Sequence, residues 1–170
     1  MIGRNSILGH CIHMTEEELH LLRDKKAGIA HCPASNIALK SGLFDARRAL
    51  TLGLKIGLGS DCAAGYNCCM LDNLRQAIIT SNVLALGKEN YQTITYKDAF
   101  RMATLGGAQA LNMDGCIGNF CVGKEFDALL IDVESPDTPI DIFHKDIFVQ
   151  QILRFKYDES IKNRHILSPF

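Results

Sequence analysis

Residues 54–65, Leu54-Lys-Ile-Gly-Leu-Gly-Ser-Asp-Cys-Ala-Ala-Gly65, carry the clearest indication of the fold. A short apolar run closed by turn residues predicts a buried strand of a parallel sheet, and Asp61 then follows the carboxyl end of that strand. Ligands bind at this end in barrels and open α/β folds, because the loops that leave the strands converge there. Asp61 is therefore a candidate for chemistry. The alternative role is a helix cap or loop turn, which is the commoner one for an isolated aspartate.

Two shorter apolar segments precede this stretch, and each ends near a histidine. Residues 6–11 predict a strand that ends at His10, and residues 29–31 predict one that ends at His31. In both cases the polar side chain follows the apolar run, as Asp61 does. If the three strands are parallel neighbours, the side chains of His10, His31 and Asp61 are expected at one edge of the sheet.

Helices are predicted between these strands. Thr15-Glu-Glu-Glu18 is a capping box that begins a helix running to about Ala27, with Gly28 as its stop. The spacing of apolar residues predicts a second helix over residues 43–52, ended by Gly53. Strands that alternate with helices at this spacing indicate βαβ units and a parallel sheet.

The following segment is expected to be helical as well. The apolar spacing predicts a helix over residues 70–86, ended by Gly87. Thr95 and Asp98 form a second capping box, and that helix should continue to about Ala103. Gly106-Gly107 is expected to break it before residues 108–113 resume the helical pattern.

Glycines punctuate the chain beyond residue 113, and residues 126–133 predict a strand. We therefore expect two regions. Residues 1–113 form the α/β part, and residues 114–170 form a separate small β region and a tail.

Composition limits the possible functions. The chain has 170 residues, of which 47% are hydrophobic, and this suffices for one real core but not for a complete barrel enzyme of about 250 residues. The net charge of −1 and the scattered charges exclude a nucleic-acid footprint. Neither a signal peptide nor an apolar run of about 18 residues is present, so we expect a cytoplasmic protein with no membrane partner.

The chain contains seven cysteines, an odd number without the spacing of a disulfide scaffold, which indicates reduced thiols. Cys11, Cys32 and Cys62 directly follow the three candidate residues. We expect them to pack beneath the site as small apolar side chains rather than to bind metal.

Histidine and carboxylate side chains are the ligands that zinc prefers, and catalytic zinc typically has three protein ligands plus water. His10, His31 and Asp61 could form part of such a site, although each histidine could equally be an ordinary hydrogen-bonded residue near a strand end. The remaining histidines are expected on the surface: His13, His20, His144 and His165. The sequence has no nucleophile elbow, phosphate-binding loop, dinucleotide fingerprint or cytidine-deaminase signature.

Many short segments, in order, match one known family. They are Gly9-His-Cys11, Ile29-Ala-His-Cys-Pro-Ala-Ser-Asn36, Lys55-Ile-Gly-Leu-Gly-Ser-Asp61, Ala64-Gly-Tyr66, Met70-Leu-Asp72, Ala103-Thr-Leu-Gly-Gly107, Gln109-Ala-Leu111, Ile117-Gly-Asn-Phe120 and Val122-Gly-Lys-Glu-Phe-Asp-Ala128. Through them the chain closely resembles the carboxy-terminal half of guanine deaminases, which are metal-dependent hydrolases of the amidohydrolase superfamily. The similarity extends to about Phe143.

The resemblance implies a fold and an activity. The fold is the last part of a (β/α)₈ TIM-like barrel, about three strands with their helices, plus part of a flanking β-sandwich. The activity is the zinc-dependent conversion of guanine and water to xanthine and ammonia in purine catabolism. By the resemblance, Asp61 binds the single zinc ion and shuttles a proton, His10 contacts the hydrolytic water and guanine, and His31 lines the substrate site.

The resemblance also implies ligands that this sequence lacks. In the family, a His-x-His pair, a further histidine with a nearby glutamate, and a substrate-binding arginine come before the matching segment. We therefore expect Asp61 to be the one zinc ligand here, and the chain to be either a fragment of a longer product or unstable and inactive alone. Two other interpretations stay open: a non-catalytic remnant that serves as an interaction or homodimer-forming module, and an amidohydrolase for another ring-bound amine or halide.

Overall fold

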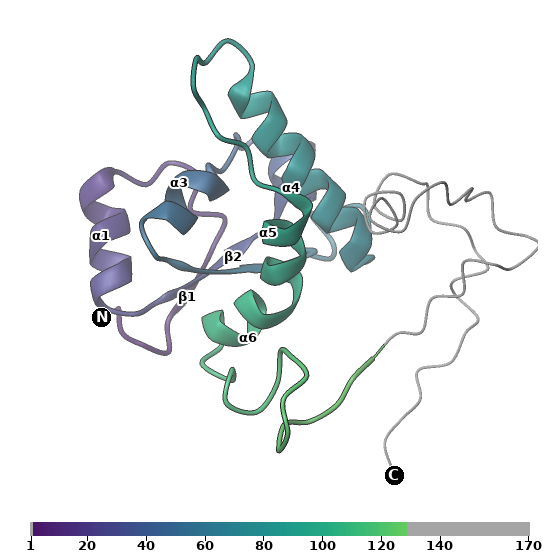
Figure 1. The fold of residues 1–170 in the computed structure, drawn as a ribbon. Helices are drawn as coiled ribbons and strands as arrows, with labels where there is room; N and C mark the ends of the chain where they lie inside the picture. The colour runs from purple at the N-terminus through teal and green to yellow at the C-terminus, as the bar shows by residue number, and fades with distance from the viewer. Residues whose placement is uncertain (1, 129–170) are drawn as a thin grey trace, which may run out of the picture.

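A parallel three-stranded sheet forms the centre of the computed structural model, which describes residues 2–128. The strands are β1 (Ile7–Gly9), β2 (Gly28–His31) and β3 (Lys55–Leu58), in the order β1-β2-β3 (Figure 1). Both neighbouring pairs are parallel, with Ile29 opposite Leu8 on one side and Ile56 on the other. The predicted parallel arrangement of the three strands is therefore confirmed.

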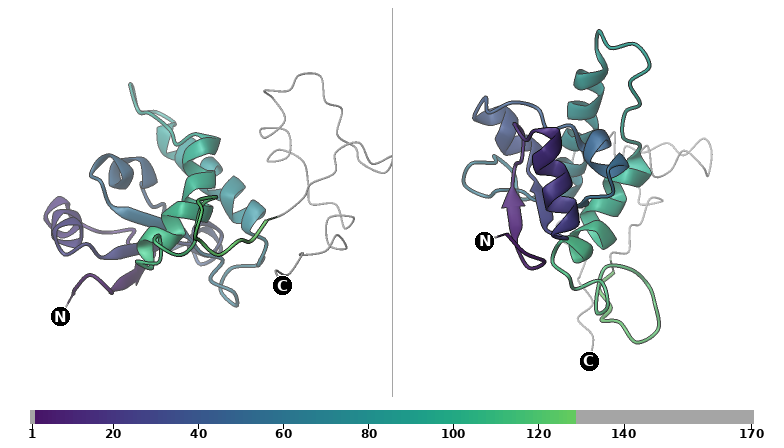
Figure 2. Two further views of the ribbon diagram at one scale, coloured as in Figure 1. Left: turned by 60° about the horizontal axis from the view of Figure 1, so that its bottom comes forward. Right: turned by 90° about the vertical axis from the view of Figure 1, so that its left-hand side faces the viewer.

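Helices connect and cover the strands. They are α1 (Glu16–Asp24), α2 (Pro33–Ala38), α3 (Ala46–Thr51), α4 (Met70–Ala85), α5 (Tyr96–Arg101), the π-helical turn η1 (Met102–Gly106) and α6 (Gly107–Ala110). The turn η1 and helix α6 lie against the sheet, η1 on β3 and α6 on β2 and β3. Helix α4 packs on α2, α3 and α5, and its carboxyl end extends away from the sheet (Figures 1 and 2).

Both predicted capping boxes are present. The Thr15 hydroxyl accepts from the backbone N–H of Glu18, and the Glu18 carboxylate accepts from the backbone N–H of Thr15 at 2.8 Å. Thr95 and Asp98 exchange the same two hydrogen bonds at the start of α5. Each box satisfies backbone donors that the first helical turn leaves without partners, and so fixes where the helix begins.

Helix ends were less accurately predicted. Helix α1 ends at Asp24 rather than near Ala27, because Lys26 takes a left-handed backbone conformation (φ +56°) and turns the chain into β2. Gly28 is the first residue of β2 and not a helix stop. Helix α3 is also shorter than residues 43–52, since Asp45 caps it by accepting from the backbone N–H of Arg48.

Helix α2 was not predicted. Strand β2 ends at His31, two residues before Pro33. Pro33 begins α2, where its fixed φ and missing N–H suit the first helical turn.

The expected break at Gly106-Gly107 was wrong, because the chain stays helical from α5 through η1 to α6. The glycines instead allow close packing. A Cβ atom on Gly106 would lie 2.5 Å from the carbonyl oxygen of Ile56, and one on Gly28 would lie 2.5 Å from that of Ala110. Only hydrogen fits at these positions, and this brings α6 and η1 onto the strands.

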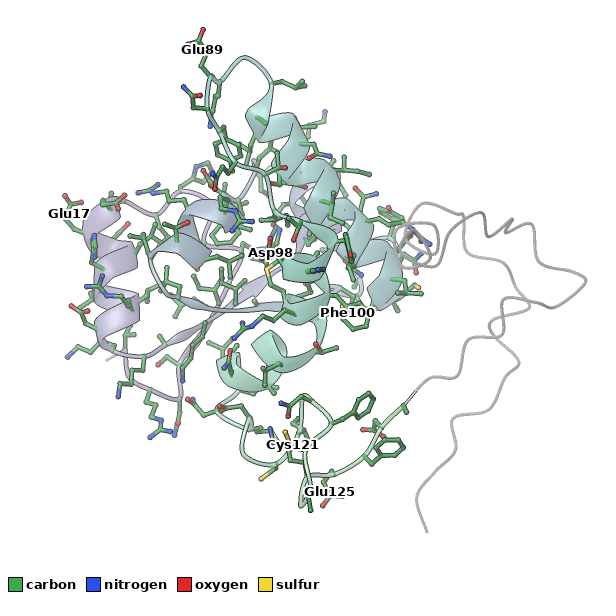
Figure 3. All side chains as sticks on the ribbon, in the orientation of Figure 1. Glu17, Glu89, Asp98, Phe100, Cys121 and Glu125 are labelled. Carbon is green, nitrogen blue, oxygen red and sulfur yellow. The ribbon has the colours of Figure 1, made fainter. Side chains whose placement is uncertain are left out.

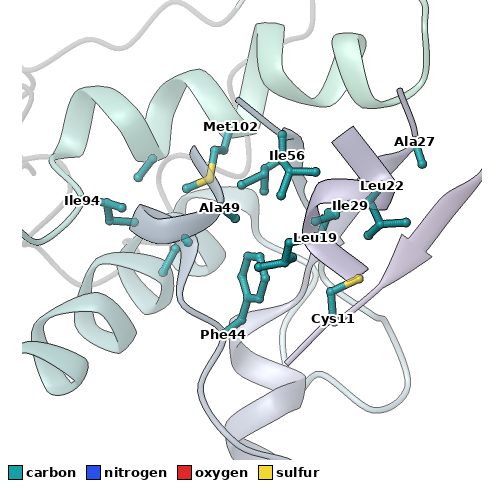
Figure 4. Packing of buried hydrophobic residues seen from close by; sticks show 14 of the residues in the cluster. Cys11, Leu19, Leu22, Ala27, Ile29, Phe44, Ala49, Ile56, Ile94 and Met102 are labelled. Atoms are coloured by element: carbon teal, nitrogen blue, oxygen red, sulfur yellow. The ribbon is translucent and has the colours of Figure 1, made fainter. Parts of the chain in front are cut away.

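The core lies between the sheet and its helices (Figure 4). Leu22, Ile29, Ile56 and Met102 are among its fully buried side chains. They come from α1, β2, β3 and η1, so their burial stabilises the packing of these four elements against one another. Burial of each large apolar side chain stabilises the fold by roughly 1.5–3 kcal/mol relative to exposure.

Helix α4 has the predicted length but a more polar buried face than its apolar pattern suggested. Leu74 and Ala77 are buried as expected, whereas Val83 is 44% exposed. Asn73 and Ser81 are buried instead. The Ser81 hydroxyl accepts from the backbone N–H of Ile94 at 2.9 Å, and the Asn73 amide donates to the carbonyl of Cys69 at 3.0 Å. These buried side chains thus provide hydrogen-bond partners for backbone groups outside the helix.

The predicted β region is tested only in part. Residues 114–128 contain turns and no strand, so the strand expected over 126–133 is absent as far as residue 128, and its remainder lies outside the described residues. The predicted division at residue 113 stays a prediction. Within residues 2–128, no helix is long and apolar enough to cross a membrane.

We expect a single added methyl group at Gly28 to separate α6 from β2. The variant Gly28→Ala should lower the free energy of unfolding by about 1–3 kcal/mol, because the new Cβ would collide with the backbone of Ala110. Gly9→Ala in the adjacent strand is the matched control, since a Cβ there meets none of the described atoms within 4 Å. Urea unfolding followed by circular dichroism measures both variants, and equal destabilisation would contradict the close packing.

Candidate functional site

The candidate site lies where β1 and β3 end. His10 follows β1 and Asp61 lies three residues after β3, and the imidazole Nε2 is 3.7 Å from the carboxylate Oδ2. Their side chains are 43% and 35% exposed, so small molecules can reach both. The structure therefore brings together two of the three side chains that the sequence predicted at one edge.

Both residues have left-handed backbone conformations, with φ of +67° at His10 and +48° at Asp61. This region costs energy for residues other than glycine, and such strain gathers at functional sites. The backbone N–H of His10 still donates to Ala30 at 2.9 Å, which continues the ladder one residue past β1. The sheet thus fixes the backbone positions of His10 and Asp61, and the left-handed turns direct their side chains toward each other.

A tight turn holds Asp61 in place. Its carbonyl accepts from the backbone N–H groups of Ala64 at 3.0 Å and Gly65 at 2.6 Å. A Cβ on Gly65 would lie 2.0 Å from the carbonyl oxygen of Ser60, so no residue with a side chain fits there. The glycine that closes the decisive sequence stretch is therefore required by the turn that carries Asp61.

Two site residues, Ser35 and Asn36, were missed by the sequence analysis. The Ser35 hydroxyl donates to Asp61 Oδ2 at 2.6 Å, and Asn36 Oδ1 lies 2.8 Å from His10 Nδ1. Both side chains are buried, and both come from α2. The sequence feature that could have indicated them is their position as two consecutive polar residues inside the family-matching segment 29–36.

An imidazole nitrogen and a carboxylate oxygen at 3.7 Å are suited to proton transfer. The gap is too wide for a direct hydrogen bond but can be bridged by a water molecule that contacts both groups. A carboxylate can accept a proton from that water and return it, and histidine is the commonest partner in such chemistry. The arrangement therefore suits hydrolysis of a small molecule.

His31 is placed differently from His10. It is fully buried at the end of β2, and its ring lies against Phe44 with centroids 5.0 Å apart. Burial, and secondarily the nearby charge of His10, lowers the pKa of His31 to about 3, so the ring is neutral. Among residues 2–128 neither ring nitrogen has a hydrogen-bond partner. Contact between His31 and substrate stays a prediction.

The three cysteines that follow the candidate residues differ in burial. Cys11 and Cys32 are buried, and burial raises the pKa of each thiol to about 11, which keeps them uncharged. The prediction that Cys62 packs beneath the site was wrong. Cys62 is exposed, and its Sγ lies 3.0 Å from the Sγ of Cys68, because the turn after Asp61 carries it outward.

The described residues do not by themselves form a complete zinc site. Catalytic zinc typically needs three protein ligands, whereas residues 2–128 contain no group of three or more histidine, cysteine, aspartate or glutamate side chains that could hold a metal. Acidic side chains are spread over the molecule, and the labelled Glu17, Glu89 and Glu125 lie far apart in Figure 3. Asp61 and the neighbouring His10 are two side chains of ligand type, fewer than a catalytic zinc site needs.

Comparison with known proteins gives one consistent result. The model of the Amidohydrolase family matches residues 2–163. Guanine deaminase from Homo sapiens is 42% identical over 173 residues, covering 98% of this chain and 38% of the human protein. The chain thus spans well under half the length of that relative.

Solved structures agree with the sequence comparison. Guanine deaminase from C. acetobutylicum, with guanine bound in its active site, is 35% identical with a TM-score of 0.65, over 71% of this chain and 28% of that one. An adenosine deaminase from Xanthomonas campestris, with bound zinc, is 28% identical with a TM-score of 0.76, over 87% and 33%. The described sheet and helices agree with the expected part of a TIM-like barrel. The expected flanking β-sandwich is not seen in residues 2–128.

The buried His31 should make stability depend on pH. Its pKa is about 3 in the fold and 6.5 in the unfolded chain, so below pH 6.5 the unfolded state binds a proton that the folded state does not. Stability is then complete above pH 6.5 and falls by about 2 kcal/mol between pH 7 and pH 5. Unfolding by urea at both pH values measures this loss.

The variant His31→Phe should flatten that pH dependence, because its ring packs on Phe44 but cannot titrate. His13→Gln removes an exposed histidine and should retain the wild-type dependence. If His31→Phe loses as much stability on acidification as the wild type, His31 is not the buried neutral group described above.

Proposed function

This chain belongs to the amidohydrolase family, a family of hydrolases, and from that membership we propose that it is the carboxy-terminal portion of a zinc-dependent guanine deaminase. The reaction converts guanine and water to xanthine and ammonia, a step of purine catabolism. The observation that carries the proposal is the similarity to guanine deaminase over 98% of this chain, together with the paired His10 and Asp61.

The proposed roles follow from the chemistry of each side chain. Asp61 accepts a proton from the attacking water and returns it to the amino group that leaves as ammonia. The imidazole of His10 contacts the same water and the guanine ring. His31 lies behind this pair and shapes the substrate site. The 3.7 Å separation of Nε2 and Oδ2, open to solvent, supports the first two roles.

We propose one zinc ion as cofactor, with Asp61 as the ligand contributed by the described residues. The bound zinc in the adenosine deaminase structure supports a metal in this fold. The other ligands have to come from outside residues 2–128, since no set of three is present within them. This portion of the chain is therefore proposed to bind zinc weakly and to be inactive alone.

A second candidate substrate is another ring-bound amine. The structural similarity to an adenosine deaminase, which covers 87% of this chain, favours this alternative. The same proton transfers would serve either substrate, because both reactions replace an amino group on an aromatic carbon with oxygen from water. Competition between guanine and adenosine for turnover distinguishes the two.

We also propose a cytoplasmic location, which the free cysteines of the described chain support. Homodimer formation stays a prediction, to be measured by light scattering of the purified chain.

A chimera tests the proposed activity. The 170 residues replace the corresponding part of human guanine deaminase, so the human protein supplies the remaining length. The chimera with zinc should release xanthine and ammonia from guanine, measured by chromatography, whereas the 170-residue chain with zinc should release none. In the chimera, Asp61→Asn should reduce kcat by about 10²–10⁴-fold, because the amide cannot accept the proton.

Asp24→Asn is the matched control, since Asp24 is an exposed aspartate at the end of α1 and should leave kcat unchanged. A chimera that folds and binds zinc but does not act on guanine would contradict the proposed function. Activity on adenosine in its place would support the second substrate, and activity on neither would favour a non-catalytic module.

A further inference from the structure

Helix α2 contacts both members of the candidate pair through two consecutive residues. The Ser35 hydroxyl donates a hydrogen bond to Asp61, and the side-chain oxygen of Asn36 lies 2.8 Å from Nδ1 of His10. Ser35 is 0% exposed and Asn36 is 2% exposed. A buried polar side chain that loses its hydrogen-bond partner cannot turn to water instead, so these contacts resist disruption by solvent or by side-chain rotation.

The contact with Asn36 determines where the imidazole proton lies. The amide oxygen of Asn36 faces Nδ1, and its amide nitrogen is buried without a hydrogen-bond partner among residues 2–128. Because an amide oxygen can only accept a hydrogen bond, Nδ1 of His10 has to donate in this arrangement. In the neutral ring, Nε2 then has no proton and presents its lone pair. This lone pair faces the Asp61 carboxylate oxygen at 3.7 Å. Two acceptors thus face a common gap, which favours a water molecule or another donor between them.

We propose that Asn36 is a positioning residue that fixes His10 as the tautomer protonated on Nδ1, so that unprotonated Nε2 faces Asp61. The catalytic purpose of this arrangement rests on the proposed function, but the tautomer is a property of the chain itself. Asn36 contacts His10 at Nδ1, whereas Nε2 is the ring nitrogen that lies 3.7 Å from Asp61, so its effect on the pair passes through the imidazole ring.

A second histidine provides an internal comparison. Nε2 of His13 lies 2.8 Å from the backbone carbonyl oxygen of Ser41. A carbonyl also only accepts, so His13 has to carry its proton on Nε2 when the ring is neutral. The two histidines are therefore expected to be opposite tautomers in the same molecule.

Nitrogen NMR of the 170-residue chain with ¹⁵N-labelled histidine rings measures this directly. The spectrum is recorded at about pH 9, well above the ordinary pKa of histidine, and a protonated ring nitrogen resonates far from an unprotonated one. His10 should show a protonated Nδ1 and an unprotonated Nε2, whereas His13 should show the reverse. The spectrum of His10→Gln assigns the His10 signals by their loss.

Two substitutions of Asn36 test its role. Asn36→Leu removes the accepting oxygen, and the two His10 ring nitrogens should move toward averaged shifts while the His13 signals stay in place. Asn36→Asp retains an accepting oxygen and should keep Nδ1 protonated. Asn82→Leu, at an exposed position of α4, is the matched control and should leave the wild-type spectrum unchanged.

Either of two results would overturn the inference. The first is a wild-type His10 that carries its proton on Nε2 or exchanges between tautomers, a result that requires no variant to fold. The second is an unchanged His10 tautomer in Asn36→Leu. A chimera that fails to deaminate guanine, with the His10 tautomer as predicted, would contradict the proposed function and leave this inference standing.

Discussion

The parallel hydrogen-bond ladder through β1, β2 and β3 is the constraint on which the candidate site depends. Strands that run in the same direction end at the same edge, so the residues that follow them meet there. The ladder continues past the strands, with the N–H of His10 donating to Ala30 and that of Gly59 donating to His31, both at 2.9 Å. A shift of one residue would exchange the faces of every side chain, which would bury His10 or expose the core.

Glycine makes this placement possible at two levels. At Gly28 and Gly106 the missing side chain lets α6 and η1 lie directly on the strands, which buries the sheet with short helices. At Gly65 the missing side chain lets the chain reverse immediately after Asp61. The first two glycines allow helices to pack on the sheet, and the third allows the turn that carries Asp61. The same residue type thus serves packing and the candidate site at different points of the chain.

The sequence predicted the features that depend on local patterns. Capping boxes at Thr15 and Thr95, the three strands, and the approach of His10 to Asp61 follow from residue types at fixed spacing. Other features depend on contacts between distant segments and leave no local pattern. The contact between Asn36 and His10 requires α2 to lie beside the end of β1, and the burial of His31 requires Phe44 to cover it. Gly106-Gly107 has the composition of a helix break, and its packing on β3 overrides that local preference.

In the proposed function, His10 and Asp61 act as one unit at the end of the sheet. A double-mutant cycle of His10→Gln and Asp61→Asn, read from kcat/KM for guanine in the chimera with the human protein, tests it most directly. When two groups act together, removing either one removes most of their joint contribution to kcat/KM. The double variant should therefore be about as slow as the slower single variant. Losses that multiply in the double variant would show that the two side chains work independently and would contradict the account.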